Sequence, residues 1–205
     1  QCRRIDRRRW WRFQGRRGRA AAVSAIPPPD PARVAALEAA LGARPDGVRL
    51  FALADASVND ALPARFYADH TLPFDCLLPG DLTAEVFRRS PFVADVTDHP
   101  EVLRWLLGGW GRAWATYALA RSTLRELVYR LRPALDARAP DGVPMLFRFY
   151  DPRVLRVAAP VLTPAQQRTL LGTVEAFVCE SLAPEVALRL SQGAAGAARA
   201  EVPLG

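Results

Sequence analysis

The chain has 205 residues, half of which are hydrophobic, and its formal net charge is +7. This length accommodates one domain with a sizeable core. The three cysteines, Cys2, Cys76 and Cys179, are odd in number and far apart, which excludes a disulfide framework and a Cys-x-x-Cys site. Such cysteine usage fits a reducing compartment, so we expect a cytoplasmic protein. Arginines interrupt the most apolar region, which excludes a transmembrane helix there.

The positive charge is concentrated at the start of the chain. All 28 basic residues are arginine, and nine of them precede Ala20 together with one acid, Asp6. The rest of the chain holds 19 arginines against 20 acidic residues, so it is close to neutral. Two interpretations of residues 1–29 remain open. They are an arm that binds nucleic acid, with Trp10 and Trp11 stacking on bases, or a disordered or non-native extension that ends in a proline-rich linker.

Hydrophobic periodicity and capping signals predict alternating strands and helices from residue 30 to residue 191, which we interpret as the domain. The predicted strands span residues 48–54, 74–78, 92–96, 114–119, 135–139, 145–150, 174–180 and 185–190. The predicted helices begin at Asp30, Val58, Asp81 or Thr83, Asp98, Thr123, Asp151 and Thr163. Asp98, Thr123 and Thr163 each stand three residues before Glu or Gln, which is the spacing of a capping box.

This order predicts an α/β or α+β fold in which helices pack on a mixed sheet, in one lobe or two. The Asp141-Gly142 pair predicts a hairpin turn, and the strands at 174–180 and 185–190 predict a second antiparallel hairpin late in the chain. The sequence from Gln192 has no period, so we expect residues 192–205 to form a disordered tail.

The stretch from Arg148 to Leu155 is the most informative part of the chain. Its beginning alternates in the manner of a strand, and Asp151 then fits the cap of a helix because its carboxylate can accept unpaired backbone N–H groups. Pro152 fits the first helical position, where a missing N–H costs little. Arg148 shares a predicted strand face with Tyr150, so its guanidinium needs a partner rather than open water.

Two arginines of this stretch are expected to have acidic partners. Asp55 and Asp151 are the candidate partners of Arg148, because burying an unpaired guanidinium is costly. Arg153 lies in the first turn of the predicted helix, where its charge opposes the helix dipole. We therefore expect Arg153 to reach an acid elsewhere in the domain or on a partner.

The sequence carries no recognisable catalytic or metal-binding motif. His70 and His99 each follow an aspartate but lack the spacing of a helical ligand pair. A Gly-x-Ser-x-Gly motif is absent, and the glycines around Trp110 lack the Lys-Ser/Thr end of a phosphate loop. We therefore predict no catalytic residues, no metal and no cofactor.

A second signature, Gly109-Trp110-Gly111-Arg112-Ala113-Trp114, lies upstream of the Arg148 stretch. Together with that stretch and three further segments, it resembles the type VI secretion effector-chaperone or adaptor family, called Tap or TEC and formerly catalogued as a domain of unknown function. The resemblance runs from about Val48 to about Ser191. The further segments are Leu50–Asp55, Leu103–Leu107 and Gly172–Phe177.

The resemblance implies a cytoplasmic chaperone or adaptor without enzymatic activity. The implied partners are a cognate type VI effector, which is a toxin, and the spike of VgrG and PAAR proteins, with no membrane partner. The signature residues, partner-binding or structural, are Asp55, Trp110, Trp114, Arg148, Tyr150, Asp151 and Arg153. The two tryptophans are interpreted as core residues or as exposed anchors for a partner. The alternative function is a nucleic-acid-associated protein that acts through the arginine-rich arm.

Overall fold

A computed structural model describes residues 30–138, 141–172, 174–183, 185–193 and 196–204. The two interpretations of residues 1–29 concern a segment outside these ranges. Within the ranges, no helix combines the length and the apolar character that a membrane crossing requires.

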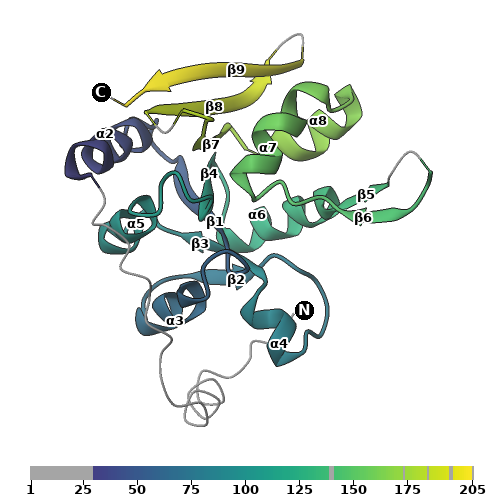
Figure 1. Ribbon diagram of the computed structural model, residues 1–205, viewed down its shortest axis with the longest axis horizontal. Helices are drawn as coiled ribbons and strands as arrows, with labels where there is room; N and C mark the ends of the chain where they lie inside the picture. Colours follow the sequence, from purple (N-terminus) through teal and green to yellow (C-terminus); the bar gives the residue numbers. More distant parts are fainter. Residues whose placement is uncertain (1–29, 139–140, 173, 184, 194–195, 205) are drawn as a thin grey trace.

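Most strands of the described chain join one sheet, which Figure 1 shows from β9 at the top to β2 at the bottom. In chain order these strands are β1 (Arg49–Asp55), β2 (Phe74–Cys76), β3 (Pro91–Asp95), β4 (Ala115–Ala120), β7 (Ala176–Glu180), β8 (Val186–Gly193) and β9 (Gly196–Pro203). Across the sheet the order is β2-β3-β1-β4-β7-β8-β9, and every neighbouring pair is antiparallel. A separate ladder is formed by β5 (Asp136–Arg138) and β6 (Pro144–Leu146).

The antiparallel sheet results from a strand inserted into a crossover. β3 and β4 run in the same direction and are joined through helix α5 (Pro100–Leu107), as in a β-α-β unit. β1 lies between them and runs the opposite way, so neither has a parallel neighbour. The predicted combination of helices, a sheet and late hairpins is confirmed. The main sheet is antiparallel rather than mixed.

Helices cover both faces of the sheet and give three layers (Figure 1). The first face carries α2 (Pro31–Gly42), α3 (Ala61–Ala68), α4 (Ala84–Arg88) and α5. The second face carries α6 (Leu124–Leu131), α7 (Pro152–Ala158) and α8 (Pro164–Leu171), with the 3-10 turns η1 (Arg132–Leu135) and η2 (Ala159–Val161).

The two-residue period of β1 divides its side chains between two hydrophobic clusters. Leu50 and Ala52 join the cluster of the first face, whereas Phe51 and Leu53 join that of the second. Burial of each large side chain contributes roughly 1.5–3 kcal/mol. By the same period, Asp55 at the end of β1 lies on the second face, which α7 covers. A carboxylate is thereby carried into the interior by an otherwise apolar strand.

The structure corrects the prediction of one strand over residues 145–150. β6 ends at Leu146, and the chain then turns so that the Arg148 carbonyl accepts the Asp151 N–H at 2.9 Å. The turn brings the guanidinium of Arg148 against Asp55 and leaves Asp151 at the start of α7. The predicted hairpin before β6 is confirmed, and Gly142 provides its left-handed residue at φ +86°.

The tail that was predicted as disordered from Gln192 is a strand instead. β8 continues to Gly193, and β9 pairs with it in register from Gly196 to Pro203. The small and charged residues of β9 show no apolar alternation, so the sequence hides a strand that pairing with β8 stabilises. Leu204, directly after β9, is buried in the first cluster.

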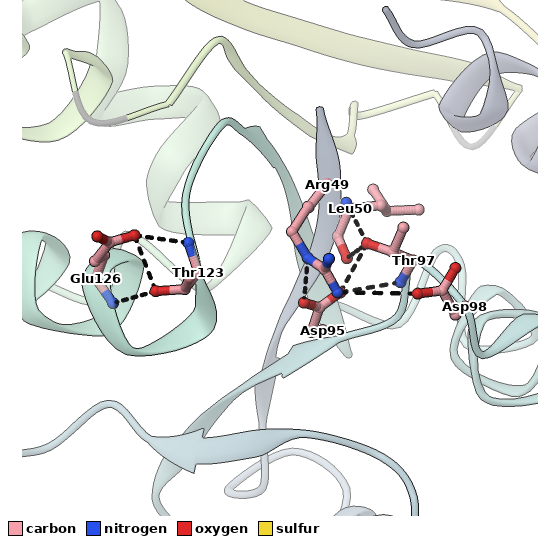
Figure 2. A network of polar contacts seen from close by, with 7 residues as sticks. All are labelled: Arg49, Leu50, Asp95, Thr97, Asp98, Thr123 and Glu126. Atoms are coloured by element: carbon pink, nitrogen blue, oxygen red, sulfur yellow. Dashed lines mark hydrogen bonds and ion pairs between the residues drawn. The ribbon is translucent and has the colours of Figure 1, made fainter. Parts of the chain in front are cut away.

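The start of β1 is fixed by a polar network (Figure 2). Arg49 donates to Asp95 at 2.6 Å and lies 3.9 Å from Asp98, and Thr97 donates to Asp95 at 2.7 Å. The predicted capping box at Asp98 is wrong, because His99 is the residue that precedes α5 and its side chain makes no cap hydrogen bond. Asp98 faces an arginine on β1 instead.

The capping boxes predicted at Thr123 and Thr163 are confirmed. The Thr123 hydroxyl accepts the Glu126 N–H at 3.3 Å, and the Glu126 carboxylate accepts the Thr123 N–H at 2.9 Å (Figure 2). Thr163 and Gln166 form the same reciprocal pair at α8. These interactions depend on residues three apart, which is why the sequence predicts them.

We expect Thr123→Ala to lower the free energy of unfolding by about 1 kcal/mol, because it removes the cap of α6. Urea unfolding followed by circular dichroism measures this loss. Thr169→Ala, at an exposed position within α8, is the matched control and should change the free energy by less than about 0.5 kcal/mol. Equal losses in the two variants would contradict the assignment.

Candidate functional site

The signature residues gather at the end of the sheet where β1 stops. Asp55 closes β1, and its backbone N–H donates to the Trp114 carbonyl at 3.0 Å, immediately before β4. Arg148 and Asp151 approach the same point from the turn before α7. The structure therefore brings the tryptophan motif (Gly109–Trp114) and the Arg148 stretch together at the end of β1.

Asp55 and Arg148 form the central ion pair. Nη2 of Arg148 donates to Oδ2 of Asp55 at 2.5 Å and to the Ser57 hydroxyl at 3.1 Å. The Ser57 N–H donates to the other carboxylate oxygen of Asp55 at 2.8 Å. The Asp55 side chain is 2% exposed and that of Arg148 is 38% exposed, so the carboxylate is interior while the guanidinium reaches the surface. Of the two predicted partners of Arg148, Asp55 is the closer, and Asp151 also lies within ion-pair distance.

Asp151 caps α7 and also binds Arg153. Its carboxylate accepts the backbone N–H of Arg153 at 3.0 Å and the guanidinium through two contacts of 2.8 and 3.0 Å. Arg148 lies 3.6 Å from the same carboxylate. Burial would raise the pKa of Asp151, but the hydrogen bonds from Arg153 and the charges of both arginines outweigh it and lower the pKa. Arg153 thus pairs with Asp151, the cap of its own helix, whereas the prediction was an acid elsewhere in the domain or on a partner.

Tyr150 lies beneath this network. The residue is buried, and the guanidinium carbon of Arg148 is 5.9 Å from the centre of its ring. Burial, followed by the negative charge of Asp55, raises the pKa of Tyr150 to about 12. The phenol is therefore neutral at physiological pH. The Tyr150 ring packs against the Arg148 guanidinium as a cation–π contact.

The tryptophan motif forms a tight loop held by a carboxylate on β7. Gly111 and Ala113 both have left-handed backbone angles, at φ +86° and +57°. The carboxylate of Glu180 accepts the Ala113 N–H at 2.6 Å. Burial raises the pKa of Glu180, although the backbone donors of Ala113 and Gly111 and the charge of Arg156 oppose the rise. Glu180 therefore stabilises a backbone conformation that an alanine seldom adopts.

The sequence analysis missed Glu180. It follows Ala176 and Val178 on one face of β7, and both are buried in the first cluster. A carboxylate on a buried strand face needs hydrogen-bond donors, so its position in the alternation was a usable signal. The donors could not be predicted, because they belong to a loop far away in the sequence.

Both signature tryptophans lie in packing contacts. Trp114 is 9% exposed, and its ring lies 5.2 Å from that of Trp105 on α5. Trp110 stacks at 6.4 Å on Tyr117 and packs against the first cluster. Gly109 leaves room for this arrangement, since a Cβ there would lie 2.1 Å from the Trp114 ring. These contacts agree with the interpretation of the two tryptophans as core residues.

The site presents two arginines above buried acids. The side chains of Arg148 and Arg153 are 38% and 53% exposed, whereas those of Asp55 and Asp151 are 2% and 3% exposed. Among the described residues, no three His, Cys, Asp or Glu side chains form a group that could hold a metal. The arrangement fixes donor groups at a surface, where acidic side chains or carbonyl oxygens of a partner can bind.

Exposed apolar side chains lie on α7, at the end of η2 and in the turn after β7. They are Val157 at 68%, Val161 at 78% and Leu182 at 85% exposure, and we call them the apolar flank. Arg156 joins its two parts, because its guanidinium donates to the Ser181 carbonyl at 3.0 Å and ties α7 to the turn after β7.

A family model described as a domain of unknown function, DUF4123, matches residues 50–169, which is more than half of the chain. The chain belongs to the DUF4123 family. The matched range contains all seven signature residues, and it ends before the Gly172–Phe177 segment of the sequence resemblance. The chain matches no curated protein and no solved structure.

We expect Gly109→Ala to destabilise this DUF4123 domain by about 1–3 kcal/mol, because the added methyl group overlaps the buried Trp114 ring. Chemical denaturation followed by tryptophan fluorescence measures the loss. Gly42→Ala is the matched control, since a Cβ at Gly42 meets nothing within 4 Å. If Gly109→Ala were as stable as the control, the close packing of the loop on Trp114 would be refuted.

The two buried acids Asp151 and Glu180 predict opposite pH dependences of stability. The lowered pKa of Asp151 gives stabilisation that is present above its unfolded pKa and is lost as pH falls through the folded one. The raised pKa of Glu180 gives stabilisation that is present below its unfolded pKa and is lost as pH rises through the folded one.

Asp151→Asn should therefore reduce stability at neutral pH and weaken the fall in stability at acidic pH. Glu180→Gln should remove the decline toward neutral pH.

Urea unfolding from about pH 3 to about pH 7 measures both effects, because the carboxyl groups titrate in that range. Asp81→Asn changes an exposed aspartate and serves as the control, for which we expect the wild-type pH profile. Parallel profiles for wild type, Asp151→Asn and Glu180→Gln would disprove the opposite contributions.

Proposed function

We propose that this chain is a cytoplasmic adaptor or chaperone that binds a type VI secretion effector and helps to load it onto the VgrG and PAAR spike. The observation that carries the proposal is the convergence of the signature residues at one end of the sheet, where Arg148 and Arg153 reach the surface. Residues far apart in sequence, on β1, in the tryptophan loop and before α7, meet there. Their contacts fix the shape of that surface and leave two arginines half-exposed.

The surface has the character of a protein-binding site. Arg148 and Arg153 provide fixed hydrogen-bond donors, and the apolar flank provides area that is released from water on binding. Arginines beside apolar groups fit a partner segment that carries both acidic and apolar side chains. An effector segment with exposed apolar side chains would aggregate in the cytoplasm, and a chaperone that binds it would prevent this.

The β5–β6 hairpin extends the proposed surface on the other side. Val143, Met145 and Leu146 are each about half exposed, at 53%, 54% and 49%. The hairpin leads directly into the turn that carries Arg148 and projects away from the main sheet (Figure 1). A flexible methionine between two aliphatic residues suits adaptable contact with a partner. Along the chain, Arg148 and Arg153 therefore lie between the exposed apolar side chains of the hairpin and those of the apolar flank.

We expect the chain to co-purify with the toxin encoded beside its gene and to keep that toxin soluble when the two are co-expressed. Val157→Asp and Leu182→Asp should reduce the co-purified toxin at least about tenfold, since each places a charge on the apolar flank. Val86→Asp is the matched control, because Val86 is also an exposed apolar residue but lies on α4, on the opposite face of the sheet.

Thermal unfolding of the purified variants separates loss of binding from loss of folding, and all three variants should retain the wild-type midpoint within a few degrees. A toxin that is equally soluble and equally secreted without this chain would refute the proposed function.

A further inference from the structure

β9 is an outer strand of the sheet, and the direction of its backbone groups can be worked out. The Ser181 N–H donates to the Val186 carbonyl, so Val186 faces β7 and the alternate residues of β8 face β9. The register of Ala187 with Val202 then makes the even-numbered residues of β9 face β8. The odd-numbered residues, 197 to 203, direct their N–H and C=O groups away from the sheet.

A side-chain contact agrees with this assignment. The N–H of Ala197 donates to the side-chain oxygen of Gln167 on α8 at 3.0 Å, which requires that it points away from β8. Pro203 has no N–H to donate. Arg199 and Glu201 therefore carry the two outward N–H groups of β9 for which the described residues provide no backbone partner. Both residues are exposed, with side chains 48% and 61% accessible.

The charges on this edge are self-complementary. Arg199 and Glu201 lie opposite Leu190 and Leu188 of β8, so both side chains stand on one face of the sheet, where they form an ion pair of 2.9 Å. If a second β9 aligns antiparallel about Ala200, Arg199 of each copy lies opposite Glu201 of the other. The neighbouring antiparallel register on one side places Arg199 opposite Arg199, and the one on the other side places Glu201 opposite Glu201. Both bring like charges together and are unfavourable.

We infer that β9 pairs antiparallel with β9 of a second copy of this chain, around a two-fold axis at Ala200. Four backbone hydrogen bonds form between Arg199 and Glu201 of the two copies, and the four side chains alternate in charge on one face. The positions that cannot donate, Ala197 and Pro203, lie opposite each other and are not needed as donors. This inference is independent of the proposed effector binding.

Sedimentation equilibrium of the full chain up to about 1 mM tests the pairing, since a dissociation constant of that size marks weak association. We expect a concentration-dependent mass that rises toward twice the 22.5 kDa of one chain. Amide exchange followed by NMR should slow at Arg199 and Glu201 as concentration rises. Ala198 and Ala200, whose N–H groups face β8, should exchange equally at all concentrations.

Three variants test the pairing: the first removes a backbone N–H together with one charge, and the other two change the charges alone. Glu201→Pro removes an outward N–H without touching the bonds to β8, so it should abolish the dimer and leave the fold intact. Arg199→Glu places like charges opposite each other and should weaken the dimer about tenfold. The double variant Arg199→Glu/Glu201→Arg restores alternating charge and should restore the dimer.

A chain that remains monomeric at all concentrations, or a dimer that Glu201→Pro leaves unchanged, would overturn the inference. A dimer that Arg199→Glu leaves unchanged, or that the double variant fails to restore, would overturn the proposed register. Association with an extended segment of another protein in place of a second copy would also overturn it.

Discussion

The contact between Asp55 and Arg148 links the end of β1, the tryptophan loop and the start of α7. Asp55 ends a strand in the middle of the sheet, and its backbone N–H binds the carbonyl of Trp114, which closes the tryptophan loop. Its carboxylate binds Arg148, which stands three residues before the cap of α7. A single interior residue thus connects a loop that follows a helix of the first face with a helix of the second face.

Because Asp55 is buried, its charge needs the Arg148 partner. A carboxylate in the interior must be compensated, and removal of its arginine would leave a charge that water cannot reach. The acids nearby are compensated in different ways. Asp151 has two arginines and a helix N-terminus, whereas Glu180 depends largely on backbone N–H groups. Burial acts to raise the pKa of both acids. At Asp151 the hydrogen bonds from Arg153 and the charges of two arginines outweigh burial, whereas at Glu180 burial outweighs the backbone donors and Arg156.

The parts that could be predicted from the sequence depend on short-range rules. The capping boxes at Thr123 and Thr163 and the turn at Gly142 involve residues within four positions of each other. Two failures have a long-range cause. The chain leaves its strand at Leu146 so that Arg148 can meet a carboxylate 93 residues away, and β9 is a strand because β8 pairs with it. The need of a buried guanidinium for an acidic partner did predict the distant contact between Arg148 and Asp55, as one of two alternatives.

The two outer strands of the sheet solve the problem of exposed backbone differently. β2 is three residues long and offers little edge, whereas β9 is eight residues long. β9 is closed at one end by the amide of Gln167 and at the other by Pro203, and between them charged residues interrupt any apolar run. Charges normally discourage edge pairing, but Arg199 and Glu201 oppose only those registers that bring like charges together. An edge that disfavours the two neighbouring registers and favours one is suited to selective pairing rather than to aggregation.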